Sequence, residues 1–277
     1  MGRLDGRTVL VTGSTGIGGA SAELFAGEGA AVFVTSRTEA HCRELCERIE
    51  AAGGRVAYQP AELGDADQVE AVVASCRARF GRVDGLFAVA GGSGRRFGDG
   101  PLHTLSGAAW DGTLALNART QALTAGAVLR SMLGRSANVD GTRGSIVLMS
   151  SVLATDPVPE LFATHAYAAA KGAIAALTIT AAAFYAPHGI RVNAVAPALV
   201  ATPMADRAMS DPATLEFARR KQPLAGGILD PLDVARAALF LLSDESRFIT
   251  GQLLKVDAGW SVVKAGLGDG DTGASAR

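Results

Sequence analysis

The stretch TVLVTGSTGIGG, residues 8–19, decides the fold. Its first part, Thr8–Thr12, is rich in β-branched residues and predicts a buried strand, and a glycine-rich turn follows directly. Glycines allow a tight turn and a close approach to a pyrophosphate, whose charge is stabilised by the N-terminus of a helix, expected here over Gly18–Gly27. Because no Gly-Lys-Ser/Thr ending follows, a P-loop is excluded, and the turn indicates a dinucleotide site.

Strand-like and helix-like segments alternate along the rest of the chain. Further strands are predicted over Ala31–Thr35, Arg55–Tyr58, Leu86–Ala90, Ser145–Met149, Ile190–Ala196 and Gln252–Val256. Further helices are predicted over Glu39–Ala52, Asp67–Phe80, Leu114–Leu133, Ala166–Ala186 and Leu232–Leu242. This alternation predicts an α/β fold, a Rossmann-like doubly wound parallel sheet flanked by helices on both faces. No linker divides the chain, so residues 1–265 are expected to form a single dinucleotide-binding and catalytic domain, with 266–277 as a flexible tail.

The composition narrows the class of protein. Of 277 residues, 48% are hydrophobic and 19% charged, which excludes a disordered chain, and a net charge of −1 without a basic block argues against nucleic acid as a partner. Cys42 and Cys46 lie four residues apart, but no second ligand pair follows, so no metal site is expected. Met1–Arg7 has no signal-peptide pattern, and the apolar stretch Gly172–Ala186 is shorter than a membrane span. We expect no membrane partner and a cytoplasmic location.

Tyr167 and Lys171 are four residues apart on a predicted helix and therefore share one face. A free phenol has a pKa of about 10, and a neighbouring cation lowers it by roughly 1–3 units. Such a tyrosine is able to act as a general acid or base near neutral pH. Taken alone, the spacing fits a surface tyrosine with a solvated lysine better.

The motifs taken together resemble the short-chain dehydrogenase/reductase family, in its classical single-domain form, over about Leu4–Trp260. The residues that carry this resemblance are the glycine turn, Asp84–Gly91 (DGLFAVAG), Asn117, Ser150 and Ser151, Tyr167 with Lys171, Arg191–Pro197 (RVNAVAP), Thr202–Met204, Ile249–Gln252 and Val256–Asp257. Their order and spacing are highly specific for the family.

The resemblance implies hydride transfer between NADP(H) or NAD(H) and a carbonyl or secondary alcohol carbon of a small-molecule substrate. It makes Tyr167 the general acid or base, and it makes Lys171 the residue that lowers the pKa of Tyr167 and bonds the nicotinamide ribose. Ser151 is expected to donate a hydrogen bond to the substrate oxygen, with Ser150 as the neighbouring candidate. Asn117 is expected to hold a water that relays protons to Lys171, the alternative being a helix-bending residue bonded to the backbone.

The resemblance also implies a set of cofactor contacts. These are Gly13, Ser14, Thr15, Gly16, Ile17, Gly18, Ser36, Arg37, Glu62, Leu63, Val89, Ala90, Gly91, Tyr167, Lys171, Pro197, Val200 and Thr202. The glycine turn is one residue shorter than the family's usual form if it closes at Gly18, whereas closure at Gly19 matches the extended members. The family's Asn-Asn-Ala-Gly is Ala88–Gly91 here, and Glu62 replaces the Asp that meets the adenine.

The end of the second strand predicts which nicotinamide cofactor is preferred. An acidic residue at the position of Ser36 would repel a 2′-phosphate, whereas Ser36 does not, and Arg37 is able to pair with that phosphate. NADP is therefore the preferred cofactor. NAD is the alternative if Arg37 merely covers the adenine face.

Two weaker features concern the substrate. Arg95 and Arg96 follow the fourth strand and are either attractive to an anionic substrate or simply solvated. A stiff apolar segment lies shortly before Tyr167 and consists of Pro157, Pro159, Leu161 and Phe162. It suggests a substrate with a hydrophobic body.

The helix over Tyr167–Ala186 carries alanines around most of its circumference. Since one face covers the sheet, the opposite apolar face predicts a homo-oligomer, a tetramer or a dimer, and a monomer is the alternative. A different class of function is a non-catalytic dinucleotide-binding redox sensor, which the short turn favours. Such a sensor has no need of the four polar residues Asn117, Ser151, Tyr167 and Lys171, and their presence argues for an enzyme.

Overall fold

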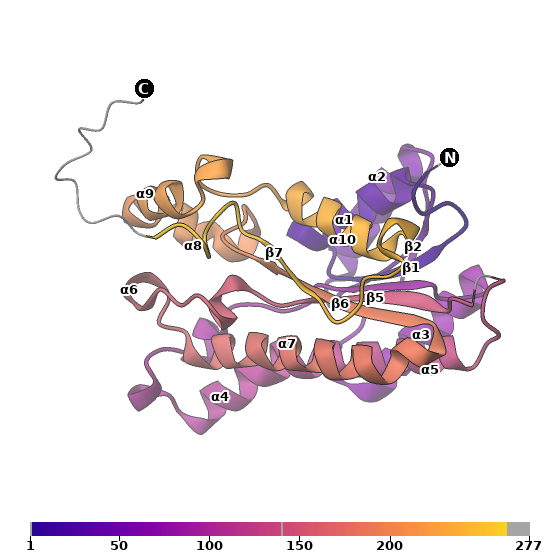
Figure 1. Cartoon of the computed structure of the whole chain (residues 1–277), viewed down its shortest axis with the longest axis horizontal. Helices are drawn as coiled ribbons and strands as arrows, with labels where there is room; N and C mark the ends of the chain where they lie inside the picture. The colour runs from indigo at the N-terminus through magenta and orange to yellow at the C-terminus, as the bar shows by residue number, and fades with distance from the viewer. Residues whose placement is uncertain (1, 140, 265–277) are drawn as a thin grey trace.

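The computed structural model describes residues 2–139 and 141–264, so the predicted tail lies outside the described residues. Within them, seven strands form one parallel sheet in the order β3-β2-β1-β4-β5-β6-β7 (Figure 1). Their bounds are β1 Thr8–Thr12, β2 Ala31–Thr35, β3 Arg55–Tyr58, β4 Gly85–Ala88, β5 Gly144–Met149, β6 Ile190–Pro197 and β7 Leu253–Val256. The predicted doubly wound sheet is confirmed. The strand order reverses between β1 and β4, and ligands bind doubly wound sheets at the carboxyl ends of such strands.

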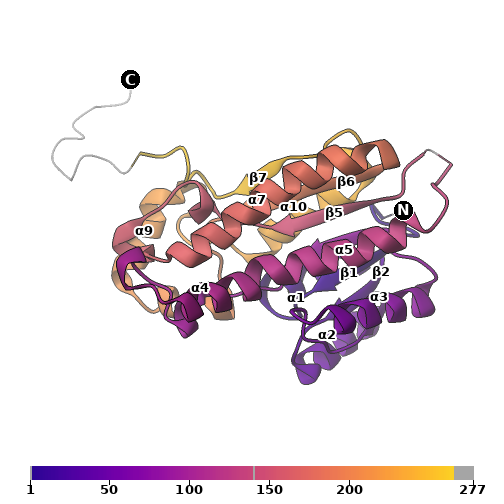
Figure 2. The same ribbon diagram turned by 90° about the horizontal axis from the view of Figure 1, so that it is seen from below.

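Helices cover both faces of the sheet. One face carries α1 (Gly16–Gly27), α2 (Glu39–Ala51) and α10 (Pro231–Leu242), and the other carries α3 (Ala66–Phe80), α5 (Thr120–Leu133) and α7 (His165–Tyr185) (Figures 1 and 2). Because successive strand residues point to opposite faces, Val9 and Val11 of β1 pack under the first set and Leu10 under the second. All five residues of β1 are buried, which is why that stretch reads as uniformly apolar or β-branched.

Two predicted elements end differently in the structure. The fourth strand stops at Ala88 rather than Ala90, so Val89, Ala90 and Gly91 belong to the loop that leaves the sheet. The stretch Leu114–Leu133 is helical as predicted, but the helix begins earlier, with α4 (Gly107–Leu114), and a π-helical turn over Ala115–Arg119 separates α4 from α5. Side-chain hydrogen bonds of a buried residue in that turn account for the change in helix type, and they are described below.

Short helices lie beyond the carboxyl ends of the strands, at the left of Figure 1. They are α6 (Pro159–Phe162), α8 (Asp206–Met209) and α9 (Pro212–Lys221). We call the apolar cluster between α6 and α9 the apolar wall, and it consists of Val152, Leu153, Val158, Leu161, Phe162, Ala198, Phe217 and Trp260. Trp260 is 2% exposed and packs between the rings of Phe162 and Phe217, at centroid distances of 6.1 and 5.3 Å. Through Trp260, the C-terminal end of the described chain is thus part of the apolar wall.

The helical region that contains α7 is longer than the apolar stretch Gly172–Ala186, which by itself is shorter than a membrane span. The helical region His165–His188 is 24 residues long with a mean hydropathy of 1.4, which by length and composition is enough to cross a membrane. One face of α7 nevertheless packs on the sheet through Ala170, Ile174 and Ala182, and the same face buries Lys171. This packing accounts for the apolar residues on that face only, since 28% of the apolar window is buried, and a single such helix is weak support for a membrane segment.

Candidate active site

Ser151 and Tyr167 come together at the end of β5. Ser151 follows that strand, Tyr167 lies in the first turn of α7, and the Ser151 side chain is close enough to the Tyr167 hydroxyl to lower its pKa. The neighbouring Ser150 is committed elsewhere, because its Oγ donates to the Lys171 carbonyl oxygen at 2.9 Å. The structure thus brings Ser151, and not Ser150, to the phenol.

Lys171 lies one turn after Tyr167 and is almost completely buried. Its Nζ donates to the Met149 carbonyl oxygen at 2.9 Å and lies 5.4 Å from the centre of the Tyr167 ring. Burial lowers the pKa of Lys171 to about 7. Burial also raises the pKa of Tyr167 to about 12, against the opposing effect of the Ser151 side chain. Desolvation, rather than the neighbouring ammonium, therefore dominates both pKa values.

Asn117 lies at the centre of the π-helical turn and is fully buried. Its Nδ2 donates to the carbonyl oxygens of Thr113 and Gly92, both at 3.0 Å, and its Oδ1 accepts from the Gly92 N–H at 3.1 Å. These bonds tie the helix to the loop after β4, and single π-turns of this kind are frequent at functional sites. The bonding to the backbone that was considered for Asn117 is thus present.

Asn117 and Lys171 also converge on one point. A Cβ atom on Gly91 would lie 2.7 Å from Asn117 Oδ1 and 3.7 Å from Lys171 Nζ. Gly91 therefore leaves open the space between the amide and the ammonium. This arrangement is compatible with a relay between the two side chains, and a larger residue at Gly91 would obstruct it.

Asp99 is a site residue that the sequence analysis missed. Its carboxylate is buried and accepts the backbone N–H groups of Ala166 and Tyr167, both at 2.9 Å. The residue at the start of the same helix, Thr164, makes no capping hydrogen bond of its own. A carboxylate from the loop after β4 thus caps α7 and fixes the turn that carries Tyr167. No local sequence signal marks it, because the two partners are 68 residues apart.

The glycine turn packs its own backbone tightly. Gly13 and Gly16 adopt φ values of +99° and +53°, which favour glycine. A Cβ atom on Gly18 would lie 2.4 Å from the Gly13 carbonyl oxygen, and one on Gly19 would lie 3.0 Å from that of Ser14. Both glycines that were considered as the end of the turn are therefore required by close backbone contacts.

The turn fits the pyrophosphate of a dinucleotide. Thr15 precedes α1 and makes no side-chain capping bond, so it leaves the N–H groups of the first turn uncapped. A Cβ atom built on Gly13 would have its nearest neighbours at 3.9 Å, so there is room beside the Gly13 Cα. Thr202 lies next to the turn, with its Cγ2 3.0 Å from a Cβ built on Gly16. Uncapped amides and open space are the features that a bound phosphate requires.

Side chains at the ends of β2 and β3 form the other end of this site. The hydroxyl oxygens of Ser14 and Ser36 are 2.8 Å apart, and Ser36 Oγ is 3.1 Å from the Cys42 sulfur. Arg37 Nη1 lies 3.8 Å from Glu62 Oε2, and both side chains are about half exposed. The remaining predicted contacts surround the same edge of the sheet, with Leu63 and Val200 buried, Pro197 at the end of β6, and Val89 and Ala90 after β4. The Ala90 N–H donates to Thr12 Oγ1 at 2.9 Å, which holds that loop against β1.

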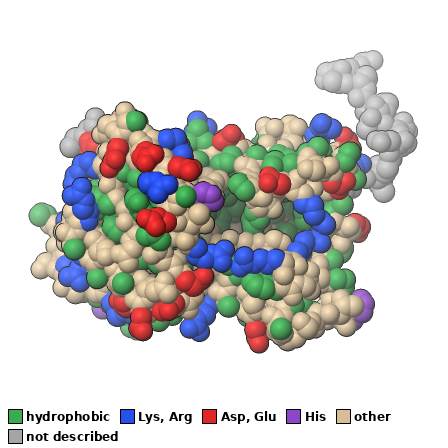
Figure 3. Space-filling view, turned by 180° about the vertical axis from the view of Figure 1, so that it is seen from behind, with side chains coloured by type: hydrophobic (Ala, Val, Ile, Leu, Met, Phe, Trp, Pro, Cys, Tyr) green, Lys and Arg blue, Asp and Glu red, His purple; other side chains and the backbone are tan. Residues whose placement is uncertain are grey.

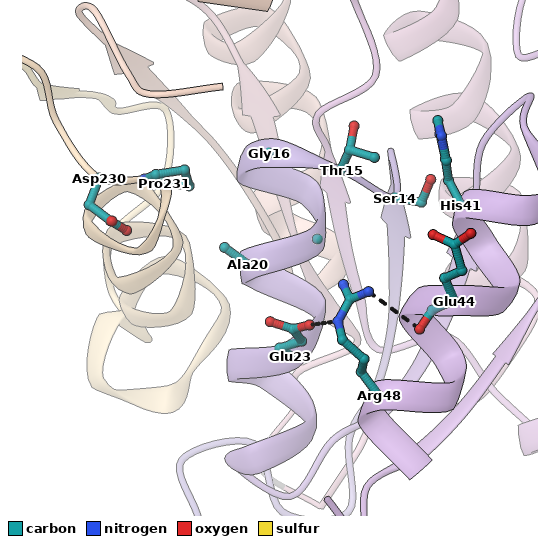
Figure 4. Close-up of a pocket in the computed structure, with 11 residues that line it drawn as sticks. Ser14, Thr15, Gly16, Ala20, Glu23, His41, Glu44, Arg48, Asp230 and Pro231 are labelled. Carbon is teal, nitrogen blue, oxygen red and sulfur yellow. Dashed lines mark hydrogen bonds and ion pairs between the residues drawn. The ribbon is translucent and has the colours of Figure 1, made fainter. Parts of the chain in front are cut away.

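A polar groove of about 360 Å³ opens on the outer side of the turn (Figure 4). It runs from Ser14 and Thr15 between α1, α2 and the start of α10, and its lining includes His41 and Asp230. Arg48 crosses it and donates to Glu23 at 2.7 Å. The groove contains none of the four catalytic candidates, so it does not define the catalytic centre. A separate hollow near the middle of the molecule holds hydrophobic side chains and has Lys and Arg side chains along its lower edge (Figure 3).

Comparison with known proteins assigns the family. A family model described as enoyl-(acyl carrier protein) reductase matches residues 11–261. The 2,5-dichloro-2,5-cyclohexadiene-1,4-diol dehydrogenase of Sphingobium indicum is 37% identical over 267 residues, covering 95% of this chain and all of that protein. The cis-4-hydroxycyclohexanecarboxylate dehydrogenase of Sinomonas cyclohexanicum is 36% identical over 258 residues, 93% of this chain and 97% of that one.

A solved structure extends the likeness to the fold. The short-chain type dehydrogenase/reductase from Mycobacterium ulcerans superimposes with a TM-score of 0.84 at 30% identity, covering 94% of this chain and 92% of that one. A doubly wound sheet with a serine–tyrosine–lysine site defines the class, and the chain belongs to the short-chain dehydrogenase/reductase family. It is an oxidoreductase of the NAD(P)-dependent kind, which sets aside the sensor alternative.

Proposed function

We propose that the protein transfers a hydride between NADP(H) and the carbonyl or secondary alcohol carbon of a small molecule, with Tyr167 as general acid or base. The observation that carries this proposal is the meeting of Ser151, Tyr167 and Lys171 at the end of β5, on the edge of the sheet that also holds the glycine turn. That edge is where doubly wound folds bind dinucleotides.

When bound, the nicotinamide supplies or accepts the hydride; the chain's own residues handle the proton. In the reducing direction, Tyr167 donates its hydroxyl proton to the substrate oxygen as negative charge develops there. A phenol with its pKa raised to about 12 is protonated at neutral pH, which is the form an acid requires. Ser151 donates a hydrogen bond to the same substrate oxygen and stabilises its charge before the proton arrives.

Lys171 restores the proton to Tyr167. Because its pKa is lowered to about 7, Lys171 exchanges protons readily at neutral pH. The space beside Gly91 connects its Nζ to the Asn117 amide, and we propose a proton path there. In the oxidising direction each step runs in reverse, so Tyr167 accepts the proton of the alcohol.

NADP is the proposed cofactor, with NAD as the alternative. Ser36 carries no charge to repel a 2′-phosphate, and Arg37 is half exposed within reach of that position. The ion pair with Glu62 competes for Arg37, but an exposed pair of this kind contributes only about 0–1 kcal/mol and is readily exchanged. A dianionic phosphate is a stronger partner for the guanidinium.

The apolar wall supports a substrate with a hydrophobic body. Its aromatic residues Phe162, Phe217 and Trp260 lie between α6 and α9, next to the segment that leads into Tyr167. The two relatives named above act on six-membered rings according to their names. We propose that this enzyme also acts on a ring-bearing ketone or secondary alcohol.

A homo-oligomer in the cytoplasm completes the proposal. The face of α7 that points away from the sheet exposes Ile179 and Phe184 by 60% and 66%. An apolar face of this kind is stabilised when a second copy of the chain covers it in a two-fold interface. We propose a dimer or a tetramer on this basis.

The test is a panel of cyclic ketones and secondary alcohols with NADPH, NADP⁺, NADH and NAD⁺, followed at the nicotinamide absorbance. We expect ketone-dependent oxidation of NADPH by at least one ring ketone. A panel without turnover in either direction, with a protein that binds NADPH, would overturn the proposed function.

A further inference from the structure

A buried glutamine holds the end of β5 at the point where Lys171 binds. Gln121 lies in the first turn of α5, shortly after the π-helical turn, and its side chain is buried. Its Nε2 donates to the Met149 carbonyl oxygen at 3.0 Å, and its Oε1 accepts the Met149 N–H at 2.9 Å. One side-chain amide therefore fixes both polar groups of a single backbone residue.

The pairing of the strands explains why a side chain is needed there. The strand β4 ends at Ala88, whose register partner in β5 is Leu148. The N–H of Ser150 donates to β6 at 2.8 Å, so the polar groups of Met149 face the side where β4 has already ended. Buried backbone groups that are left unpaired are unfavourable. The amide of Gln121 pairs with them in place of a strand.

The Met149 carbonyl oxygen is also the hydrogen-bond acceptor of Lys171. The Nζ of Lys171 donates to it at 2.9 Å, in addition to the bond from Gln121, and a carbonyl oxygen has two lone pairs for two such donors. The backbone carbonyl of Lys171 is held as well, because it accepts the Ser150 hydroxyl. The amide, the carbonyl and the ammonium thus form one buried chain of hydrogen bonds from α5 through β5 to α7.

The ammonium at the end of this chain lies beside the other polar groups of the site. A Cβ atom on Gly91 would lie 3.7 Å from its Nζ and 2.7 Å from Asn117 Oδ1. The same Nζ lies 5.4 Å from the centre of the Tyr167 ring. Asn117 precedes Gln121 by four residues, so one short stretch of the chain supplies both buried amides.

We propose that Gln121 is a positioning residue of the active site: by fixing the Met149 carbonyl, it determines where the Lys171 ammonium lies. This inference rests on the proposed function, in which Lys171 returns the proton to Tyr167. Catalytic groups depend on fixed neighbours, because a displacement of about 1 Å can cost about 10²-fold in rate. Without the Gln121 amide the carbonyl is free to turn, and the ammonium follows it.

The first test observes the Lys171 side chain by NMR without cofactor or substrate. The chain has four lysines, which are Lys171, Lys221, Lys255 and Lys264. Protein labelled with ¹³Cε-lysine therefore gives few signals, and Lys171→Met identifies the one of interest. A lysine side chain that is held in place gives separate shifts for its two ε protons. Gln121→Met removes both bonds at similar side-chain size, and we expect the two shifts of Lys171 to merge.

Gln121→Glu tests the same contact through charge. A carboxylate beside the Met149 carbonyl lies next to the ammonium, and an opposite charge favours the charged form of a group. Burial lowers the pKa of Lys171 to about 7, and the surrounding segments carry the Tyr167 phenol and the Asp99 carboxylate, which bonds the backbone of α7. In this variant the pH titration of the Lys171 signal should move upward by about one pH unit or more. The uncharged acid keeps both bonds to the backbone, so this variant remains informative if Gln121→Met does not fold.

Turnover adds a second measurement. In Gln121→Met, kcat for ketone reduction should fall by about tenfold or more, since the return of the proton depends on the placement of Lys171. The KM for the ketone should stay the same, because Ser151 and Tyr167 make the proposed contacts with the substrate oxygen. A loss of stability alone would lower the midpoint of urea unfolding and leave the kcat of the folded enzyme unchanged. An unchanged kcat in Gln121→Met would contradict the inference.

Gln222→Met is the matched control. Gln222 is fully buried, and its amide makes the same pair of bonds with the backbone of Leu199, both at 3.0 Å. Its loss should lower the urea midpoint by a similar amount and leave the Lys171 signal unchanged. A Lys171 signal that is the same in wild type and in both Gln121 variants, or that changes equally in Gln222→Met, would overturn the inference. If the signal changes as expected but no ketone is turned over, only the proposed function fails.

Discussion

The backbone N–H of Tyr167 donates to the carboxylate of Asp99 at 2.9 Å, although 68 residues separate them. The bond joins the loop after β4 to the first turn of α7. Asp99 is buried, and its second oxygen accepts the Ala166 N–H. The position of the phenol is thus set by a residue from another part of the chain, and this has a measurable consequence.

Replacing Asp99 should destabilise the protein and misplace Tyr167. Loss of a helix cap costs about 0.5–2 kcal/mol, so Asp99→Ala should lower the free energy of unfolding by at least that amount. The kcat should fall while the Kd for NADPH stays the same, and Asp99→Asn, which keeps one acceptor oxygen, should recover part of the kcat. Thr164→Ala is the control, because Thr164 makes no capping bond. An equal effect of the two alanine variants in urea unfolding and kinetics would contradict the role of Asp99.

Tyr167→Phe should remove the acid and keep the ring in place. General acid–base catalysis contributes about 10²–10⁴-fold, so activity should fall by at least two orders of magnitude with NADPH still bound. Ser151→Ala should lower kcat by about 10²-fold through loss of the oxyanion contact. Ser150→Ala, whose hydroxyl bonds the Lys171 carbonyl, is the matched control and should have a much smaller effect. Near-wild-type turnover by Tyr167→Phe would refute the assignment.

The buried Lys171 should make stability depend on pH. Its pKa is lowered from 10.5 to about 7 in the folded protein by burial. Between these values the unfolded chain binds a proton that the folded protein lacks, so the contribution of Lys171 to stability increases as the pH rises from 7 towards 10.5. Below pH 7 both states are protonated, and the full cost of the buried ammonium applies.

Lys171→Met tests this dependence through urea unfolding at pH 6 and pH 9 without cofactor. The free energy of unfolding of Lys171→Met minus that of wild type should be larger at pH 6 than at pH 9. One pKa unit corresponds to about 1.4 kcal/mol, and the change between the two pH values should be a few times this amount at most. Tyr167→Phe is the control, since the raised pKa of Tyr167 acts only above about pH 10. The same pH dependence in wild type and Lys171→Met would rule out a buried, titrating lysine.

Arg37 should decide between the two nicotinamide cofactors. We expect wild type to bind NADPH more tightly than NADH, and Arg37→Asp to abolish or reverse this preference because the 2′-phosphate would meet a negative charge. Glu62→Gln removes the competing partner of Arg37 and should increase the preference for NADPH. Fluorescence titration of both cofactors measures each Kd. Equal Kd values in wild type would contradict the prediction.

The outer face of α7 should hold the oligomer together. Light scattering at micromolar concentration should give at least twice the chain mass of 28.2 kDa. Ile179→Asp or Phe184→Asp should shift this mass towards the monomer by placing a charge in the apolar interface. Phe248→Asp alters an apolar residue outside α7 that is even more exposed, and it should leave the mass unchanged. A wild-type mass near 28.2 kDa would defeat the prediction.

The sequence predicted those parts of the fold that depend on local patterns. The strand Thr8–Thr12 and its glycine turn lie within a dozen residues, and the spacing of Tyr167 and Lys171 follows directly from helix geometry. Contacts between distant segments left no such pattern. The capping of α7 by Asp99 and the bonds from Asn117 to Gly92 depend on how the loop after β4 meets two helices, which no local signal encodes.

The pKa of Lys171 illustrates the same limit in the chemistry. Four-residue spacing correctly places the ammonium near the phenol, at 5.4 Å from the ring centre. Its effect on Tyr167, however, depends on how much water both groups lose, and burial is a property of the assembled sheet and helices. Proximity was predictable from the sequence, whereas the local solvation was not.

The loop after β4 has a practical consequence for changing substrate range by mutagenesis. Arg95 and Asp99 are four residues apart in one short segment; Arg95 donates to the carbonyl oxygen of Leu161 in the apolar wall, and Asp99 holds the first turn of α7. Libraries that randomise the whole segment would lose active clones for a reason unrelated to recognition. Varying positions 95–97 with Asp99 held fixed would let selectivity evolve while turnover is preserved.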